Sequence, residues 1–248
     1  MSKIKLNNIN TQAPEKIDKV AYKRELDKLH KELFTLQHLF YASHAYSLLI
    51  IFQGIDTSGK DSTIRQVFSH VNPLGVHATS FKAPCDMELE HDYMWRIFQK
   101  LPEKGMIQIF NRSHYEDILV PTIQKTLPQQ VIEKRYDFIN AFEHHLLDNK
   151  TLLLKFFLHI SENEQKKRIQ ERLTDPIKKW KYSEDDIKSS KKWKSYTQVY
   201  EQILNRCSHE IPWVIVPADN KWYRNYVVAS IIVKQLKQLN LKYPNKTK

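Results

Sequence analysis

Short apolar segments alternate with longer amphipathic segments along most of the chain. The apolar segments predict β-strands near 47–53, 76–82, 106–110, 151–158 and 212–216. The amphipathic segments predict helices near 60–70, 87–100, 128–148, 161–174, 185–206 and 221–240. Prolines such as Pro73, Pro121 and Pro176 are expected at the joints between these elements. Regular succession of strands and helices predicts a three-layer α/β/α fold with about five parallel strands.

A different pattern precedes the first strand. From Pro14 to Ala42 the apolar positions recur at spacings of three and four, which predicts one amphipathic helix. Its stripe consists of Tyr22, Leu26, Leu29, Leu33, Leu36 and Phe40. The stripe can pack on the helix's own domain or form a subunit contact, and both alternatives stay open. Residues 1–13 lack periodicity and are expected to be mobile. This predicts a tail and helix at 1–45, a domain at 46–240 and a terminal tail at 241–248.

The first predicted strand leads into a glycine loop. The loop, Gly54-Ile55-Asp56-Thr57-Ser58-Gly59-Lys60, contains two of the chain's 4 glycines. A G-x-x-x-x-G-K loop between a strand and a helix is typical of a phosphate-binding loop, in which backbone N–H groups cradle the anion and the lysine reaches the terminal phosphates. Two residues depart from the common form. Asp61 stands where Ser or Thr normally holds Mg²⁺, and Asp56 lies inside the loop.

A second polar cluster follows the third predicted strand, which ends on Asn111 and continues into Arg112-Ser113-His114-Tyr115-Glu116-Asp117. P-loop enzymes usually carry Asp at the tip of this strand to hold Mg²⁺ through water. The carboxylates must therefore come from elsewhere, and Asp56, Glu116 and Asp117 are the candidates. Glu116 and Asp117 can instead cap a turn or helix. Arg112 is suited to bidentate phosphate binding.

The charge of the chain indicates an acidic partner. The formal net charge is +11, from 39 Lys+Arg against 28 Asp+Glu. Nucleic acid, a phosphorylated metabolite and an inorganic polyanion are all compatible with it. The segment from Lys166 to Lys194 contains eleven cations against five carboxylates, with aromatic residues between them. Arg168 and Arg172 share a helix face in it. This segment resembles the mobile lid of a small kinase, at about 165–200. A solvated basic face and a single-stranded nucleic-acid surface are the alternatives.

Composition also limits the location. No apolar run reaches the roughly 20 residues that a membrane-spanning helix requires. The N-terminus lacks an apolar signal region. Cys85 and Cys207 have neither metal-like nor paired spacing. His114, His144, His145 and His159 also lack metal-ligand spacing and are expected to be structural. We therefore expect a cytoplasmic protein with free thiols and no membrane contact.

Several motifs together are similar to the polyphosphate kinase 2 family. They are the segments 54–65, 71–75, 80–84, 110–117, 163–168 and 217–222. The form Asn111-Arg112-Ser113-His114-Tyr115-Glu116-Asp117 resembles the branch often called class III, whereas another branch carries Asp in place of Asn111. The resemblance covers roughly residues 15–240.

This resemblance implies a P-loop kinase-like fold and a kinase that takes phosphate from inorganic polyphosphate. The acceptors are AMP and ADP, with guanine nucleotides left open, and Mg²⁺ is required, with Mn²⁺ as its substitute. A homo-oligomer, either dimer or tetramer, is implied as well. An ATP-dependent small nucleotide kinase is the main alternative, and a nucleic-acid-binding module is the least favoured.

The resemblance and the loop chemistry assign roles to individual residues. The expected catalytic residues are Asp56, Lys60, Arg112, Asp117 and Arg172. Phosphate is expected at Gly54, Thr57, Ser58, Gly59, Lys60, Asp61, Ser62, Arg65 and Arg168. The nucleotide is expected at Asn72, Phe81, Lys82, Asn111, Arg112 and Glu116, and the metal at Asp56, Glu116 and Asp117.

Overall fold

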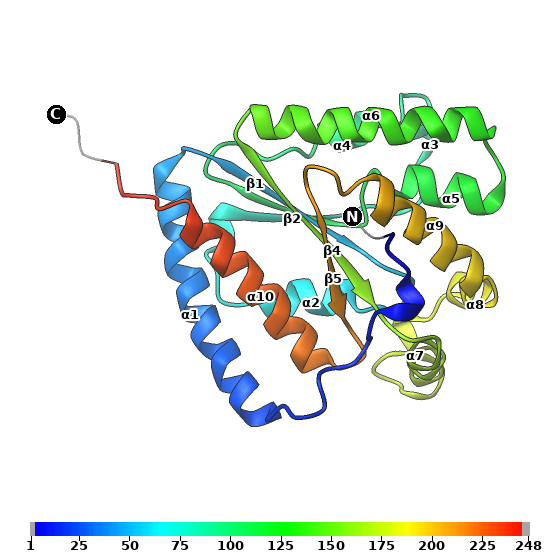
Figure 1. Ribbon diagram of the computed structural model, residues 1–248, viewed down its shortest axis with the longest axis horizontal. Coiled ribbons are helices and arrows are strands. Elements are labelled where there is room, and N and C mark those ends of the chain that lie inside the picture. The colour runs from blue at the N-terminus through cyan, green and yellow to red at the C-terminus, as the bar shows by residue number, and fades with distance from the viewer. Residues whose placement is uncertain (1–2, 245–248) are drawn as a thin grey trace.

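The five predicted strands form one parallel sheet in the computed structural model (Figure 1). The structure describes residues 3–244 apart from the side chains of Asp185 and Asp186, so residues 245–248 of the predicted terminal tail lie outside the described residues. The strands are β1 (Ser47–Gln53), β2 (Val76–Ser80), β3 (Ile107–Asn111), β4 (Thr151–His159) and β5 (Trp213–Pro217). Their order across the sheet is β2-β3-β1-β4-β5. β1 therefore lies at the centre of the sheet, with β3 and β2 on one side and β4 and β5 on the other.

Helices cover both faces of the sheet, so the predicted α/β/α fold is confirmed. The α-helices are α1 (Lys19–Ser43), α2 (Lys60–Val67), α3 (Asp86–Leu89), α4 (Trp95–Phe98), α5 (Glu116–Gln124), α6 (Gln129–Asp148), α7 (Glu162–Thr174), α8 (Glu184–Lys191), α9 (Trp193–Arg206) and α10 (Lys221–Gln238). Three short 3₁₀ segments join them, η1 (Leu6–Asn8), η2 (Pro73–Gly75) and η3 (Lys179–Lys181). Between residues 3 and 244, the helices are too short or too polar to span a bilayer.

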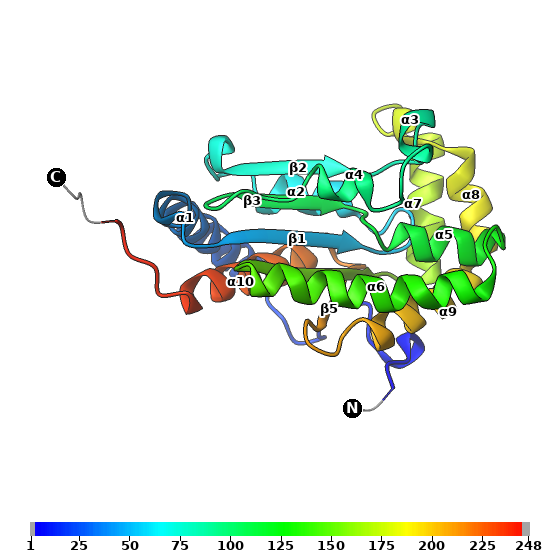
Figure 2. The same cartoon turned by 90° about the horizontal axis from the view of Figure 1, so that it is seen from above.

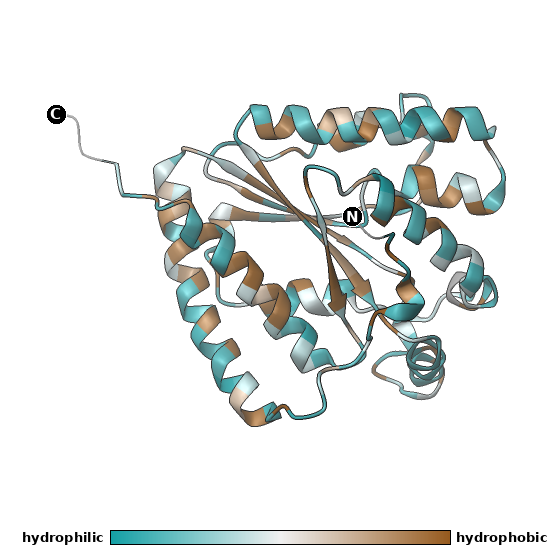
Figure 3. Cartoon of the chain, viewed as in Figure 1, coloured by the Kyte–Doolittle hydropathy of each residue, from teal (hydrophilic) through white to brown (hydrophobic). Residues whose placement is uncertain are grey.

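Alternate residues of β1 supply the two halves of the core. Leu48, Ile50 and Phe52 pack with buried side chains of α1, α2 and α10. Leu49 and Ile51 pack with buried side chains of α5, α6 and α9 on the opposite face. Every residue of β1 is buried, because a parallel strand covered on both faces has no solvent side. Figure 3 shows the strands in brown and α7, which belongs to the predicted lid, largely in teal.

The apolar stripe of α1 packs against α10 of the same chain. Leu33 and Phe40 of the stripe are fully buried. The ring of Tyr22 meets the ring of Tyr226 on α10, with centroids 4.5 Å apart. α10 therefore occupies the face that was the candidate for a subunit contact. α1 begins at Lys19, later than predicted, because the side chain of Asp18 caps it by accepting from the backbone N–H of Val20 at 2.8 Å.

Two predicted helices are each divided into two. The segment 87–100 contains α3 and α4, separated where the Asp92 carboxylate accepts from the backbone N–H of Met94 at 2.9 Å. Such a bond offers the backbone an alternative to helix. The segment 185–206 contains α8 and α9, which meet at Lys192 with φ −102° and ψ 21°. A hydrophobic pattern with period 3.6 does not reveal breaks of this kind.

The N-terminal segment is docked on the domain, so the prediction of a mobile segment at 1–13 was wrong for the described residues. Leu6 is buried, and its N–H donates to Glu201 of α9 at 2.8 Å. The hydroxyl of Thr11 donates to Asp219 at 2.8 Å. Figure 1 shows this dark blue segment passing from the end of β4 to α1. One buried leucine and a few polar contacts hold it, and neither produces a periodic pattern.

Candidate active site

The loops that follow β1, β3 and β4 meet at the carboxyl edge of the sheet. In Figure 2 the strands point toward this edge, where α5, α7 and α8 are gathered. In open α/β sheets ligands bind outside the carboxyl ends of the strands, at the place where the strand order reverses. That place in this sheet is the gap between β1 and β3, at the glycine loop.

The glycine loop has the backbone of an anion cradle. Gly54 and Gly59 have φ of +149° and +101°, and Thr57 has a left-handed φ of +66°. A Cβ on Gly54 would stand 2.7 Å from the carbonyl oxygen of Leu158, so another residue type would not fit. α2 begins at Lys60, and the first N–H groups of a helix lack an intrahelical acceptor. The hydroxyls of Thr57 and Ser58 are buried without a partner among the described residues. The loop thus offers several unused donors at one point.

Lys60 is buried at this point. Its Nζ donates to the carbonyl oxygen of Gly54 at 2.7 Å. Burial, and then the charge of Arg112, lower the pKa of Lys60 to about 8. Because an anion in the cradle would favour the charged amine, phosphate binding and protonation of Lys60 support each other.

Asp56, Arg112 and Glu116 form a charged cluster beside Lys60. Arg112 Nη2 lies 2.7 Å from Asp56 Oδ1. Burial opposes ionisation of Asp56, yet Lys60 and Arg112 hold its pKa below the ordinary value. Burial raises the pKa of Glu116 despite the charges of Arg112 and Lys60, and the charge of Asp56 adds to this rise. Arg112 has a left-handed φ of +63°, a strained conformation for a residue other than glycine. The structure therefore brings four predicted residues from two loops together.

A cavity of about 780 Å³ opens next to this cluster. Its walls include Asp56, Arg112, Glu116 and Asp117 and also the predicted residues Phe81 and Lys82. Asn111 lies at the tip of β3, where its amide nitrogen donates to Ser80 Oγ at 2.9 Å and to the Asp61 carboxylate. Asn111 thus anchors Asp61 at the start of α2.

Two arginines that the sequence did not single out line the same cavity. Arg96 Nη2 lies 3.4 Å from Asp117 Oδ2, and its Nη1 donates to the carbonyl oxygen of Lys82 at 2.9 Å. The guanidinium of Arg135 lies over the ring of Tyr93, 4.2 Å from its centroid. No spacing in the sequence connects Arg96 or Arg135 with Asp117, because the three residues come from α4, α6 and α5.

Pro121 leaves a backbone carbonyl oxygen of α5 free to bind Arg135. It lies inside α5 and not at a joint, so that part of the proline prediction was wrong. Proline has no N–H, and the carbonyl oxygen of Asp117, four residues earlier, loses its helical donor. Arg135 supplies a donor to that oxygen through Nη1. The missing hydrogen bond is thus replaced by a side chain that also lines the cavity.

Asp117 has other cationic partners than Asp56 and Glu116, since it pairs with Arg96 and not with Arg112. Burial raises the pKa of Asp117, opposed by the charges of Arg96 and Arg135. Among the described residues no group of three or more His, Cys, Asp or Glu side chains is arranged to hold a metal ion. Asp56 and Glu116 form the pair that best suits Mg²⁺, because it accepts few protein carboxylates together with phosphate oxygens and water.

Several predicted site residues do not line the cavity. Asn72 precedes β2 and caps η2, accepting from the N–H of Leu74 at 3.0 Å. It lies at the amino end of β2, whereas Phe81 and Lys82 follow the carboxyl end of that strand, and Asn72 does not line the cavity. Arg65 is exposed in the last turn of α2 and does not line the cavity, so its contact with phosphate stays a prediction.

Arg168 and Ser62 lie behind the glycine loop. Arg168 Nη1 donates to the carbonyl oxygens of Thr57 and Ser58, both at 3.0 Å, and its Nε bonds Glu164 at 2.7 Å. With its nitrogens engaged in this way, Arg168 supports the loop and does not face the cradle. Ser62 Oγ donates to the carbonyl oxygen of Gly59 at 2.9 Å. Arg168 and Ser62 thus both bind carbonyl oxygens of the glycine loop.

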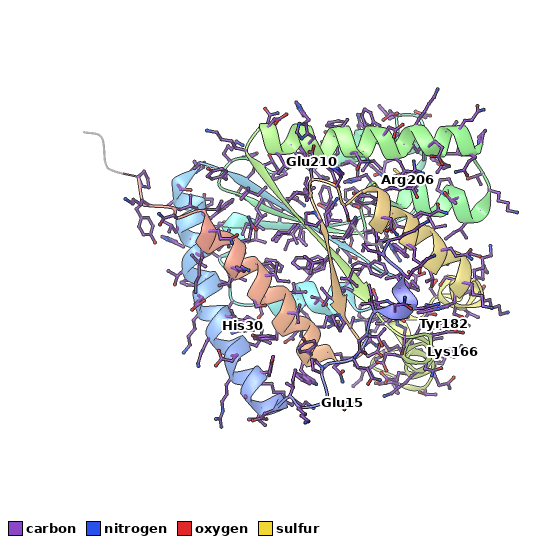
Figure 4. All side chains as sticks on the ribbon, in the orientation of Figure 1. Glu15, His30, Lys166, Tyr182, Arg206 and Glu210 are labelled. Atoms are coloured by element: carbon purple, nitrogen blue, oxygen red, sulfur yellow. The ribbon has the colours of Figure 1, made fainter. Side chains whose placement is uncertain are left out.

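The predicted lid touches the cavity through α8 and α9. Lys188, Ser189, Lys192 and Tyr196 contribute to its walls, and the Ser189 hydroxyl bonds the Asp56 carboxylate. Arg172 lies in the last turn of α7, where its Nη1 donates to the carbonyl oxygen of Lys181 at 3.2 Å. It does not line the cavity in this conformation. Lys166 and Tyr182 lie on the outer side of this region in Figure 4.

Comparisons with known proteins agree on one family. The family profile described as polyphosphate kinase 2 matches residues 16–244. An AMP/ADP-polyphosphate phosphotransferase of Meiothermus ruber is 46% identical over 227 residues, which cover 91% of this chain and 85% of that protein. An ADP-polyphosphate phosphotransferase of Rhodopseudomonas palustris is 38% identical, over 94% of this chain and 87% of that protein. The crystal structure of polyphosphate kinase 2 from Arthrobacter aurescens TC1 superposes with a TM-score of 0.96 and 35% identity, over 100% of this chain and 90% of that one. This chain belongs to the polyphosphate kinase 2 family.

Proposed function

We propose that this protein is a phosphotransferase that moves a terminal phosphate between inorganic polyphosphate and the nucleotides AMP and ADP. The observation that carries the proposal is the convergence of Lys60, Asp56, Arg112 and Glu116 beside one large cavity. The relatives named above are described as AMP/ADP- and ADP-polyphosphate phosphotransferases, which supports polyphosphate as donor. The net charge of +11 favours a polyanionic substrate.

Each residue of the cluster has a role in the proposed reaction. The loop N–H groups and Lys60 hold phosphate oxygens, and Arg112 stabilises charge on the transferred group. Asp56 and Glu116 would hold Mg²⁺, or Mn²⁺ in its place, which neutralises developing charge on the phosphates. The buried position of Glu116 suits this, because a cation would favour the ionised carboxylate that burial disfavours. Transfer of this kind depends on alignment and charge, so no histidine base is required.

The nucleotide would occupy the other side of the cavity. Phe81, Lys82 and the Tyr93–Arg135 pair present an aromatic and cationic surface there. Such a surface suits a base and a phosphate. Asp117, which pairs with Arg96, would position this wall and have no direct metal contact. Arg172 would act after closure of α7 and α8 over the polyphosphate.

A comparison of two phosphate donors tests the function. Purified protein is given AMP or ADP with Mg²⁺ and either long-chain polyphosphate or ATP, and new nucleotides are separated by chromatography. We expect ADP and ATP to form from polyphosphate. The variant Lys60→Ala should lose turnover, while Lys237→Ala should keep it, because Lys237 lies in the last turn of α10 and pairs with Glu32 of α1. Transfer from ATP with none from polyphosphate would reject the proposal in favour of an ATP-dependent nucleotide kinase. Repeating the assay with GMP and GDP tests guanine acceptors.

We also propose a homo-oligomer and a cytoplasmic location. The large apolar side chains of Phe34 and Tyr41 on α1 and Leu74 in η2 are exposed, by 50%, 36% and 72%, which supports a subunit contact on this side. Light scattering behind a sizing column distinguishes monomer, dimer and tetramer. Cys85 and Cys207 are both free thiols, as expected in a reducing compartment.

A further inference from the structure

Arg224 is a buried guanidinium that packs directly against the phosphate-binding loop. It lies in the first turn of α10, and only 1% of it is exposed. A Cβ on Gly59 would stand 2.0 Å from Arg224 Nη1. The guanidinium therefore lies directly against the backbone of Gly59, whose φ of +101° favours glycine. No motif of the sequence pointed to Arg224, which is far from the loop in the chain.

The hydrogen bonds of Arg224 go to neutral acceptors. Its Nη2 donates to Ser62 Oγ at 3.0 Å, and Nη1 to the carbonyl oxygen of Ser58 at 3.4 Å. Its Nε and Nη2 both reach Asn225 Oδ1, at 3.2 and 3.0 Å. Within the described part of the chain no carboxylate forms an ion pair with it. Burial, and then the like charge of Arg168, lower the pKa of Arg224 to about 9. A buried charge in this situation destabilises the fold unless an opposite charge comes close.

The peptide unit between Ser58 and Gly59 connects Arg224 with the anion cradle. Its carbonyl oxygen accepts from Arg168 Nη1 at 3.0 Å and from Arg224 Nη1 at 3.4 Å. The N–H of the same peptide unit belongs to Gly59, at the start of α2. Two cationic donors on the carbonyl hold the orientation of this unit and increase the positive charge at its N–H end. A single peptide unit therefore separates Arg224 from a phosphate bound in the cradle.

We propose that Arg224 is a positioning residue for the phosphoryl donor, and that the phosphate chain in the loop is the counter-charge that this buried guanidinium lacks within the protein. This inference rests on the proposed function, since it assumes that the loop binds the donor's phosphates. It goes beyond it by assigning part of the binding to a residue that never touches the ligand. The unfavourable free energy of burying the unpaired guanidinium of Arg224 is then offset when the donor binds.

Binding of inorganic tripolyphosphate with Mg²⁺, measured by calorimetry on the full chain, tests the charge of Arg224 separately from its shape. Arg224→Met removes the charge and keeps most of the volume, and Arg224→Lys keeps the charge. We expect Kd to rise about tenfold or more in Arg224→Met and to stay within about threefold of wild type in Arg224→Lys. Arg224→Gln is a second variant without charge, used if Arg224→Met does not fold as judged by circular dichroism.

Arg206→Met serves as the matched control, because it also removes one positive charge. Arg206 pairs with Glu133 at 2.6 Å, and Figure 4 shows it near α6, away from Lys166 and Tyr182 of the lid region. Its Kd should equal that of the wild type. A Kd near the wild-type value in Arg224→Met or Arg224→Gln overturns the inference, and so does equal weakening by the lysine and uncharged variants. Failure of the wild type itself to bind tripolyphosphate would instead reject the proposed function.

Discussion

Lys155 should be one of the most sensitive positions for stability, although it belongs to none of the sequence motifs. It lies in the middle of β4, 1% exposed, and its Nζ donates to Glu143 Oε2 and to the carbonyl oxygen of Cys207, both at 2.6 Å. The Tyr115 hydroxyl also donates to the Glu143 carboxylate, at 2.7 Å. In Lys155→Met the methionine fills most of the same space. The Glu143 carboxylate then loses its only lysine partner among the described residues and stays buried.

Two separate arguments give similar values for the loss in the free energy of unfolding of Lys155→Met. Removal of one partner from a buried ion pair costs about 3–5 kcal/mol. Alternatively Glu143 takes up a proton, which at about pH 7.5 costs about 4 kcal/mol, since this pH lies roughly three units above the ordinary glutamate pKa. With an m-value of about 3 kcal/mol/M, the urea midpoint should fall by about 1 M or more.

Urea unfolding followed by tryptophan fluorescence and circular dichroism measures this loss, and coincident curves establish two-state behaviour. Lys166→Met is the control, because its partner Glu162 on α7 is exposed, and such a pair contributes about 1 kcal/mol or less. Replacing both partners, as in Lys155→Met with Glu143→Leu, should recover most of the loss. A midpoint of Lys155→Met equal to that of Lys166→Met would refute this reasoning.

Three further predictions concern pH, the carboxylates and the lid. Burial opposes ionisation of Glu143, but Lys155 and His114 hold its pKa below the ordinary value. The Lys155–Glu143 pair therefore contributes stability above about pH 4.3, and this contribution is lost as the pH falls through the folded pKa of Glu143. The difference in urea midpoint between wild type and Lys155→Met should narrow on acidification, and a constant difference would contradict this cause. Glu116→Gln should raise the Mg²⁺ concentration that gives half-maximal turnover by about tenfold, whereas Asp117→Asn should lower turnover severely even at saturating Mg²⁺; an unchanged rate in Asp117→Asn would remove this residue from the site. Arg172→Ala should raise the KM for polyphosphate with little change in Tm, and comparable losses in both would identify Arg172 as a structural residue.

The site could be predicted from the sequence wherever its residues are neighbours in the chain. Asp56 and Lys60 belong to one loop, and Arg112 and Glu116 to another, so motif spacing was sufficient to identify them. Arg96, Arg135 and Arg224 come from separate helices and reach the site only through packing. A lone arginine on a helix gives no signal of its own in a sequence with 39 basic residues.

Some errors came from applying general rules to particular residues. Arg168 was expected at phosphate on a helix face that it shares with Arg172, whereas its guanidinium donates to the carbonyl oxygens of Thr57 and Ser58. Pro121 was placed at a joint because proline removes a helical donor, and here Arg135 replaces that donor. In both cases a long-range contact decided the outcome.

The sequence by itself determined the class of fold, the glycine loop, and the charged residues that are neighbours in the chain, Asp56 with Lys60 and Arg112 with Glu116. It could do so because hydrophobic periodicity and turn chemistry are local properties of a chain. Only the tertiary structure decided which charges are buried, which of them lack a counter-charge, and which side of the loop each arginine faces. Burial and electrostatic pairing depend on distances between segments that are remote in sequence. Arg224 is the clearest case, since its guanidinium packs against a loop that is remote from it in the sequence.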